Sequence, residues 1–258
     1  MPTRHPNKPN TPRNLQLTAR DRAVLMGLFE ARVFTLKQLA KLFFDDRYEM
    51  TKKRLQKLKA AGYVRALARP PFQPSALVLA KKGFIAVRRA DGLSRYPEIP
   101  WNTFYKRTQI AESTLRHELT VSDVRVALLS AIRERTDLEL IELTTWPSLT
   151  QFEARFRAKR DGLTFKKAVT VRPDGFLRLR QNFPNRPPRE FRFYLEVDRS
   201  TESQSVLLEK AKAYQDHYTQ EGDHFRVLFV FQTLQRLLHT HQVNSSSGLP
   251  NIRQLGSI

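Results

Sequence analysis

The sequence of 258 residues contains no cysteine. Disulfides, thiolate nucleophiles and zinc or iron–sulfur centres held by cysteine are therefore excluded. Long apolar runs are also missing, since a run such as Val227–Phe231 is far shorter than the roughly 18 residues that cross a bilayer. The opening segment MPTRHPNKPNTPRN lacks the apolar stretch of a secretory signal. We therefore expect a cytoplasmic protein that has no membrane partner.

Acidic residues are scarce relative to basic ones. Forty-five Lys and Arg against twenty-five Asp and Glu give a formal net charge of +20. A field of this size attracts polyanions, of which nucleic-acid phosphates are the commonest. Because the sequence Gly-x-x-x-x-Gly-Lys-Ser/Thr is absent, we do not expect nucleotide hydrolysis by a P-loop. The composition thus favours a nucleic acid as the partner.

The distribution of proline and polar residues divides the chain. Residues 1–17 are predicted to be a disordered basic tail, and residues 242–258 a flexible tail, because neither composition can bury much apolar surface. Residues 92–107 contain two prolines and no periodic pattern, which predicts an interdomain linker. We therefore expect two domains, over residues 18–91 and 108–241.

Residues 18–91 show three short helical patterns followed by two strand-like segments. Thr18 and Thr35 are each placed to cap a helix, and a third helix is predicted over Glu49–Ala61. The strands, over residues 63–68 and 75–80, are joined by the loop RPPFQP. Three helices followed by a β-hairpin are the element order of a winged helix-turn-helix, with this loop as the tip of the wing.

The third predicted helix separates apolar from basic residues. Thr51, Leu55 and Leu58 fall on one stripe that faces the core. In a helix-turn-helix the opposite surface lies in the major groove, where Gln pairs with adenine and Lys with guanine or phosphate. The alternative is a solvated, Lys-rich face that contacts a protein. The predicted DNA-binding residues are Lys52, Lys53, Gln56, Lys57, Lys59 and Arg69.

Residues 108–241 combine helical and strand-like patterns. A long helix is predicted over residues 109–135 and a second over 203–218. Strands are predicted over residues 138–143, 167–171, 175–179, 192–197 and 226–231. We assign this succession, which has one strand-like segment more than the pattern, to the order αβββαβ, an α/β sandwich in which a helix crosses back onto the sheet. Together with the winged helix-turn-helix, it gives an α+β fold class.

Acidic residues interrupt or end apolar strands in this second domain. Asp174 stands between two of the predicted strands, and Glu196 and Asp198 stand at the end of another. A charge at such a position is unfavourable unless a partner compensates it. Mg²⁺ or Mn²⁺ is one such partner, because Mg²⁺ favours one or two carboxylates plus substrate phosphate. Asp174 and Glu196 are the predicted ligands, and metal-activated water would then attack a phosphodiester.

Several motifs occur in an order that resembles a known family. They are RHELTVSDVRVAL (residues 116–128), RPDGF (172–176), LEVDRSTES (195–203), EKAKAY (209–214) and FRVLFVF (225–231). This pattern is similar to the bacterial replication-relaxation family of plasmid- and mobile-element-associated proteins. The segment LAKKG (79–83) in the predicted winged helix is also similar to the replication-relaxation family. The second domain resembles, in addition, the PD-(D/E)XK nuclease superfamily. The resemblance spans nearly the whole chain.

The resemblance implies a set of catalytic candidates. The superfamily has a lysine two residues after its strand glutamate, but this chain has Asp198 there, so Lys210 in the next helix is the candidate replacement. An additional acid from the first helix of the domain is expected, with a neighbouring histidine. The alternative is a buried, hydrogen-bonded cluster in a non-catalytic relative, because a fold does not by itself establish chemistry. The candidates are Asp174, Glu196, Asp198, Lys210, Glu118, Asp123 and His117.

Three hypotheses on function follow. The first is a double-stranded DNA-binding protein of a plasmid or mobile element that acts in replication, transfer or transcriptional control. The second is a Mg²⁺-dependent endonuclease that cuts DNA at or near the site bound by its winged helix. The third is an adaptor that recruits a replication, relaxase or transposition protein through its second domain. Because the strand lysine is displaced, catalysis is the less favoured expectation.

Overall fold

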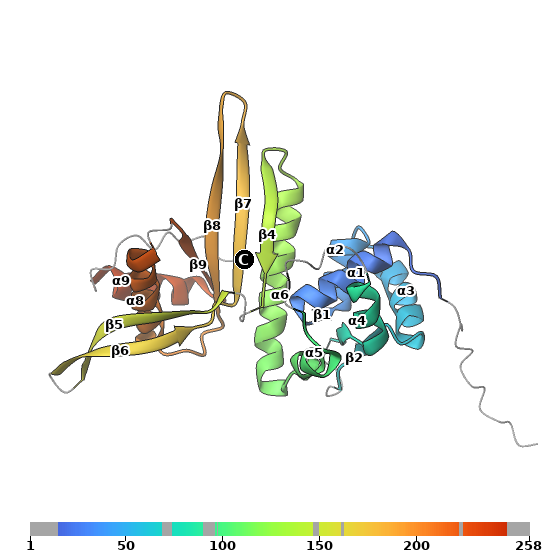
Figure 1. Ribbon diagram of the computed structural model, residues 1–258, viewed down its shortest axis with the longest axis horizontal. Coiled ribbons are helices and arrows are strands. Elements are labelled where there is room, and N and C mark those ends of the chain that lie inside the picture. Colours follow the sequence, from blue (N-terminus) through green and yellow to red (C-terminus); the bar gives the residue numbers. More distant parts are fainter. Residues whose placement is uncertain are drawn as a thin grey trace, which may run out of the picture. The chain divides into compact units, whose positions relative to one another are not determined.

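The structure is a computed structural model that describes residues 15–68, 74–89, 96, 98–146, 150–160, 163–221 and 224–246. The chain forms two compact units, Met1–Val126 and Ala127–Ile258. Helix α6 (Glu112–Arg133) begins in the first unit and ends in the second. Helices and strands both contribute to the fold (Figure 1), which is of the predicted α+β class.

The first unit contains a cluster of helices and a small antiparallel sheet of order β1-β3-β2. Its helices are α1 (Ala19–Ala31), α2 (Leu36–Phe43), α3 (Tyr48–Ala60), α4 (Lys81–Arg88) and α5 (Trp101–Thr108). Its strands are β1 (Phe34–Thr35), β2 (Val64–Ala66) and β3 (Ala76–Leu79). The sequence predicted three helices and then two strands, and the structure adds the short strand β1 at the edge of the sheet.

Local sequence signals fix where the first helices begin. The Thr18 hydroxyl accepts from the Asp21 backbone N–H while the Asp21 carboxylate accepts from the Thr18 backbone, which is a capping box. Thr35 and Gln38 form the same arrangement at the start of α2. The predicted caps are therefore confirmed. The apolar stripe of α1, which includes Leu28 at 0% exposure, is buried.

The predicted linker over residues 92–107 contains helix α5, which packs into the core of the first unit. The Phe104 side chain is fully buried and stacks on Phe29 and Phe84, with ring centroids 5.2 and 4.8 Å apart. Arg107 donates to the Phe29 and Glu30 carbonyls at 2.8 and 2.9 Å. The linker prediction is corrected here, because the segment contributes a helix and a core side chain rather than a free connection.

The first half of α6 also belongs to the first unit, although the sequence placed it in the second domain. The Ser122 hydroxyl donates to the Val33 carbonyl at 2.8 Å. Arg125 forms a buried ion pair with Glu30 of α1 at 2.5 Å. Because these contacts fall within Met1–Val126, the boundary between the two units lies inside α6 and not at residue 108.

The second unit is built on a four-stranded sheet of order β4-β7-β8-β9. The strands are β4 (Leu138–Thr144), β7 (Gly175–Phe183), β8 (Arg186–Asp198) and β9 (Arg226–Phe231). Strands β4, β7 and β8 pair antiparallel, whereas β9 returns parallel to β8 after helix α8 (Gln204–Glu221). With α6 before it, the sheet has the predicted order αβββαβ.

Two elements of the second unit differ from the prediction. The predicted strand over residues 167–171 is part of β6 (Leu163–Val171), which pairs with β5 (Phe152–Arg160) in a separate hairpin and not with the main sheet. The predicted tail over residues 242–258 overlaps helix α9 (Leu234–Ser246). The hairpin packs on α8 through Phe156 and Tyr214, so contacts with this helix, and not with the main sheet, hold the hairpin.

Candidate nucleic-acid interface and acid cluster

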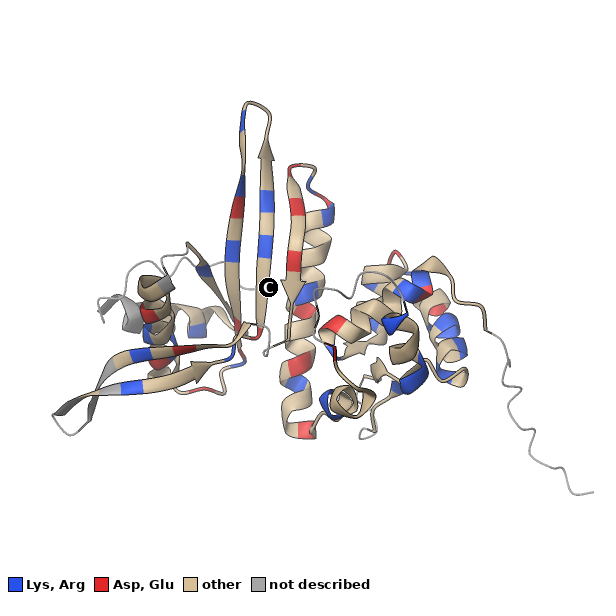
Figure 2. Cartoon of the chain, in the orientation of Figure 1, with Lys and Arg blue, Asp and Glu red and all other residues tan. Residues whose placement is uncertain are grey.

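Helix α3 presents the predicted basic face to solvent. Thr51, Leu55 and Leu58 are buried, at 0, 4 and 0% exposure, whereas all five predicted DNA-binding residues on this helix are exposed. The helix carries no acidic residue after Glu49, and its Lys and Arg positions are coloured blue on the α3 ribbon in Figure 2. The exposed set is Lys52, Lys53, Gln56, Lys57 and Lys59. Arg69, the sixth predicted residue, lies outside the described residues.

The remaining basic residue in the middle of α3 points the other way. The Arg54 guanidinium binds the Asp21 carboxylate with two nitrogens, one of them at 2.7 Å from Oδ1. Asp21 is 1% exposed, and although burial acts to raise its pKa, the hydrogen bonds from Arg54 and Thr18 lower it. The pair joins α3 to the start of α1 and fixes the rotation of α3 about its axis. That rotation is what directs the lysines outward.

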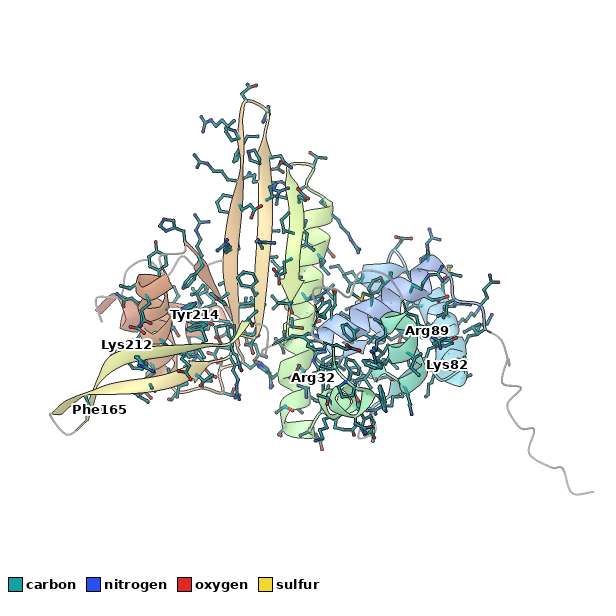
Figure 3. All side chains as sticks on the ribbon, viewed as in Figure 1. Arg32, Lys82, Arg89, Phe165, Lys212 and Tyr214 are labelled. Carbon is teal, nitrogen blue, oxygen red and sulfur yellow. The ribbon has the colours of Figure 1, made fainter. Side chains whose placement is uncertain are left out.

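The candidate acid cluster is centred on Glu196 of β8. One Glu196 carboxylate oxygen accepts from Lys210 Nζ at 3.0 Å, and the other accepts from Tyr214 Oη at 2.6 Å. Lys210 and Tyr214 lie four residues apart on α8 and therefore share a helix face; Tyr214 is labelled in Figure 3. The return of Lys210 toward the strand acids, expected from the sequence, is present as a contact. Its role in catalysis stays a prediction.

Asp198 lies two residues after this glutamate on β8, and Asp174 lies in the turn before β7. Asp198 is 4% exposed and accepts from Arg236 Nε of α9 at 2.7 Å and from the Ser200 N–H at 2.9 Å. Asp174 Oδ2 accepts from the Val197 N–H at 2.8 Å, which ties the turn before β7 to β8. The position expected to hold a catalytic lysine thus holds an acid that is already neutralised by an arginine.

The electrostatic state of Glu196 follows from its burial. Desolvation raises the pKa of Glu196 to about 7, with Lys210 acting to lower it and the nearby Asp174 charge acting to raise it. Burial alone would lower the pKa of Lys210, but Glu196 and Glu202 raise it above its usual value. Lys210 is protonated at neutral pH, because the carboxylates of Glu196 and Glu202 stabilise its charge. Glu196 therefore titrates near neutral pH.

The residues present fit a ready-made metal centre poorly. Within the described part of the chain, no three His, Asp or Glu side chains are placed to hold a metal ion. Both oxygens of Glu196 already accept hydrogen bonds, from Lys210 and Tyr214. Mg²⁺ or Mn²⁺ at Glu196 would have to share these oxygens with both donors, beside the positive charge of Lys210, and take its other ligands from water or substrate phosphate.

The three remaining candidates lie on α6, within the first unit. Arg32 forms an ion pair with Glu118, and Gln38 Nε2 donates to Asp123 Oδ1 at 2.7 Å. His117 is half-buried beside them. Arg32 compensates the charge of Glu118, whereas Asp123 is exposed and its charge is solvated, so neither carboxylate needs a metal ion to balance it. Glu118 and Asp123 therefore belong to the packing of the first unit, whereas the acid cluster around Glu196 belongs to the second.

Sequence reasoning missed Arg236, Tyr214 and Glu202. Arg236 belongs to α9, which was not predicted, and also donates to the Glu202 carbonyl. Tyr214 was detectable, because it follows Lys210 by one helical turn in EKAKAY. Glu202 accepts from Lys210 Nζ at 2.8 Å through one oxygen, and its other oxygen is buried with no hydrogen-bond partner among the described residues.

Comparison with known protein families assigns the chain to a class. The model of the replication-relaxation family matches residues 25–227, which covers most of both units. The chain therefore belongs to the replication-relaxation family, and this membership indicates a role in the replication or transfer of a plasmid or other mobile element. No curated protein and no solved structure matches the chain. In the described part of the chain, no helix has both the length and the hydropathy needed to cross a membrane.

Proposed function

We propose that this protein binds double-stranded DNA during the replication or transfer of a plasmid or mobile element. In this proposal the first unit is a winged helix-turn-helix, with α3 as the recognition helix and the β2–β3 hairpin as the wing. The order of elements, the three-stranded sheet and the α2–α3 packing support the proposal. Family membership supports the biological setting.

The orientation of α3 carries the proposal. Four lysines point outward while the one arginine between them points inward to Asp21. Among the described residues, none of these lysines forms an ion pair with an acid. Exposed cations that the protein leaves uncompensated are available to an external polyanion, and phosphate is the polyanion a helix of this kind meets in a major groove. Gln56, in the same face, can pair with adenine.

Removal of the central lysines tests the proposal. Lys53→Ala with Lys57→Ala should weaken binding to a duplex of about 40 base pairs at least roughly tenfold, and should lower the salt slope by about one for each phosphate that is no longer bound. Fluorescence anisotropy across a salt series measures both. The charge-matched control is Lys81→Ala with Lys106→Ala, two exposed lysines of the same unit outside α3. Equal affinities of the two double variants would reject α3 as the DNA-binding helix.

A metal-dependent DNA endonuclease is the second candidate function. The observation that favours it is the 3.0 Å contact between Lys210 Nζ and Glu196, because it places a cation beside a strand acid near Asp174. In a phosphodiesterase such a lysine would stabilise negative charge that develops on the phosphate. The Asp198–Arg236 pair weighs against it, since it fills the place of the missing strand lysine.

Nicking of supercoiled plasmid in Mg²⁺ or Mn²⁺ tests this second candidate. We expect no cleavage above that of Lys210→Ala, because both oxygens of Glu196 are engaged by side chains of the protein. Metal-dependent nicking that is abolished in both Asp174→Ala and Lys210→Ala, with DNA binding retained, would establish the endonuclease instead. Because Asp174 and Lys210 both belong to the cluster around Glu196, the far-UV circular dichroism of both variants must match that of the wild type before a common loss is assigned to chemistry.

A further inference from the structure

Strands β7 and β8 continue past the end of their neighbour β4 as a two-stranded ribbon. Strand β4 pairs with β7 only as far as Leu138 opposite Gln181, and the last hydrogen bond there runs from the Asn182 N–H to the Asp137 carbonyl at 2.8 Å. Strands β7 and β8 pair further, to Phe183 opposite Arg186. Figure 1 shows the hairpin projecting past the end of β4. Residues 182–189 are therefore supported mainly by their own pairing.

A bulge sets the side chains of this overhang. Gln181 pairs with Arg189 and Phe183 pairs with Arg186. One residue of β7 therefore lies opposite two residues of β8 between these pairs. Pro187 and Pro188 lie on β8, the strand that carries the extra residue of the bulge. A missing backbone N–H is tolerated there, because the bulge already interrupts the hydrogen bonds between the two strands. Directly paired residues share a face of a sheet, so the register puts Arg186, Arg189 and Phe183 on one face of the ribbon.

Charge compensation stops where the overhang begins. Arg180, within the sheet, is neutralised by Glu139 at 3.2 Å and Glu190 at 2.8 Å. Beyond it the sequence QNFPNRPPR, residues 181–189, contains two arginines and no acid. Residues 184–189 are all exposed. The tip is thus a small cationic surface with one half-buried aromatic ring and three prolines.

We propose that this ribbon tip enters a groove of duplex DNA as a second contact, separate from α3. The proposal rests on the proposed DNA-binding function and adds a site to it. A two-stranded ribbon fits the major groove, which is about 12 Å wide and about 8.5 Å deep. The overhang rises roughly 10 Å at about 3.3 Å per residue, which is enough to reach the floor of the groove. Arg186 and Arg189 contact phosphates or base edges, and the prolines limit the entropy cost of binding.

An alternative role for the same residues is protection of a sheet edge. Arginines and prolines on an exposed ribbon prevent pairing with the edge of another molecule. This role predicts aggregation when the tip residues are replaced, but no change in DNA affinity of the remaining monomer. The two roles are therefore separated by measuring oligomeric state and DNA affinity on the same samples.

The test compares paired variants of the full chain on the same duplex of about 40 base pairs. Arg186→Ala with Arg189→Ala should weaken binding about fivefold to tenfold and lower the salt slope by about two, one for each arginine removed. Arg186→Lys with Arg189→Lys should keep most of the affinity because it keeps both charges. The charge-matched control, Arg133→Ala with Arg155→Ala, removes two exposed arginines of the same unit and should bind like the wild type.

The outcomes distinguish the contact at the ribbon tip from the proposed DNA binding through α3. If the α3 variant binds weakly and the tip variant binds like the control, the second contact is rejected while DNA binding stands. If neither variant binds more weakly than its control, DNA binding through α3 is rejected as well. A tip variant that aggregates, with unchanged affinity in the monomer fraction, assigns the tip to edge protection and overturns the inference.

A positional measurement does not depend on a change in affinity. Because the chain has no cysteine, Asn185→Cys places a single thiol in the turn of the ribbon. A thiol-linked iron chelate on this residue should cut bound DNA at a discrete position. The same label on Thr219→Cys, an exposed position of α8, should cut less and without a preferred position. Equal, diffuse cutting by the two labelled proteins would overturn the inference.

Discussion

Helix α3 and the α8–β8 acid cluster use charge in opposite ways. The lysines of α3 are exposed and lack acidic partners among the described residues, whereas Glu196 and Asp198 are 2 and 4% exposed and each has a basic partner. A buried charge left alone is strongly unfavourable, so the second unit must supply its own counterions. An exposed charge is solvated and can remain unpaired until a partner binds. The comparison separates charges that face a ligand from charges that maintain the fold.

The same contrast occurs within a single turn of α3. Lys53 and Arg54 are adjacent in sequence, yet Lys53 is exposed while Arg54 binds the buried Asp21. A count of basic residues in the sequence treats the two alike. Their burial shows that one is available to DNA and that the other holds α3 against α1.

The largest effect is expected when Arg236 is removed. Arg236→Met leaves Asp198 buried without its cation and should lower the free energy of unfolding by about 3 kcal/mol. Urea unfolding followed by circular dichroism measures the change. Asp198→Asn in the same chain should restore part of the stability, because it removes the uncompensated charge. Arg135→Met, which breaks an exposed pair with Asp137, should change stability little. Equal destabilisation by Arg236→Met and Arg135→Met would show that the buried ion pair contributes no more to the free energy of unfolding than the exposed one.

A smaller decrease in stability is expected at Arg54. Arg54→Ala removes two hydrogen bonds to the Asp21 carboxylate, which keeps those from Thr18, and should lower the free energy of unfolding by about 2 kcal/mol. Lys53→Ala should leave stability within about 0.5 kcal/mol and act on DNA affinity instead. Thermal melts and anisotropy on both variants check the pair of expectations. A large destabilisation by Lys53→Ala would mean that the outward orientation of this residue is misassigned.

The pH dependence of stability should report on Glu196. Its pKa is raised from about 4.5 to about 7, so between these values the unfolded chain releases a proton that the folded chain keeps. Stability therefore falls as pH rises across this window, by up to about 1.4 kcal/mol per pH unit, and is constant with respect to this group above it. Glu196→Gln should flatten that slope, whereas Glu153→Gln, at an exposed position, should not. The same slope in both variants would assign it to other groups.

The smallest effect is expected from metal. If Asp174 and Glu196 hold Mg²⁺ or Mn²⁺, about 10 mM Mn²⁺ should stabilise the chain by roughly 1 kcal/mol for a dissociation constant in the millimolar range. Asp174→Ala should abolish this effect, because one remaining carboxylate holds a divalent ion weakly. Differential scanning calorimetry with Mn²⁺, and with Ca²⁺ as a comparison ion, measures the shift. No shift in the wild-type protein would reject the site.

Local patterns were sufficient where neighbouring residues alone fix the structure. The caps at Thr18 and Thr35 and the buried stripe of α3 were predicted, because capping and helical periodicity depend on residues within one or two turns. The αβββαβ order of the main sheet and the family were also predicted, from the succession of motifs. Helix α5 was not, because its Phe104 is recognisable as a core residue only once Phe29 and Phe84 are in place.

The candidate site divides in the same way. Lys210, Glu118 and Asp123 were all assigned to the acid group from the resemblance. The structure places Lys210 in contact with Glu196, whereas it gives Glu118 and Asp123 partners in the first unit. Arg236 was not found, because it meets Asp198 across 38 positions of sequence and lies on helix α9, which the sequence analysis did not predict. Long-range ion pairs leave no periodic signal in a single sequence.

The amino-acid sequence on its own established the strong positive charge, the absence of thiol chemistry, the basic helix and the motif order of the family. Those properties depend on composition and on spacings within a few residues. The tertiary structure alone revealed which charges are paired and where α5 packs. It also showed that strands β7 and β8 extend past the end of β4. These features arise when distant segments exclude water from one another, because only then does an unpaired charge become unfavourable and an unsupported strand become exposed.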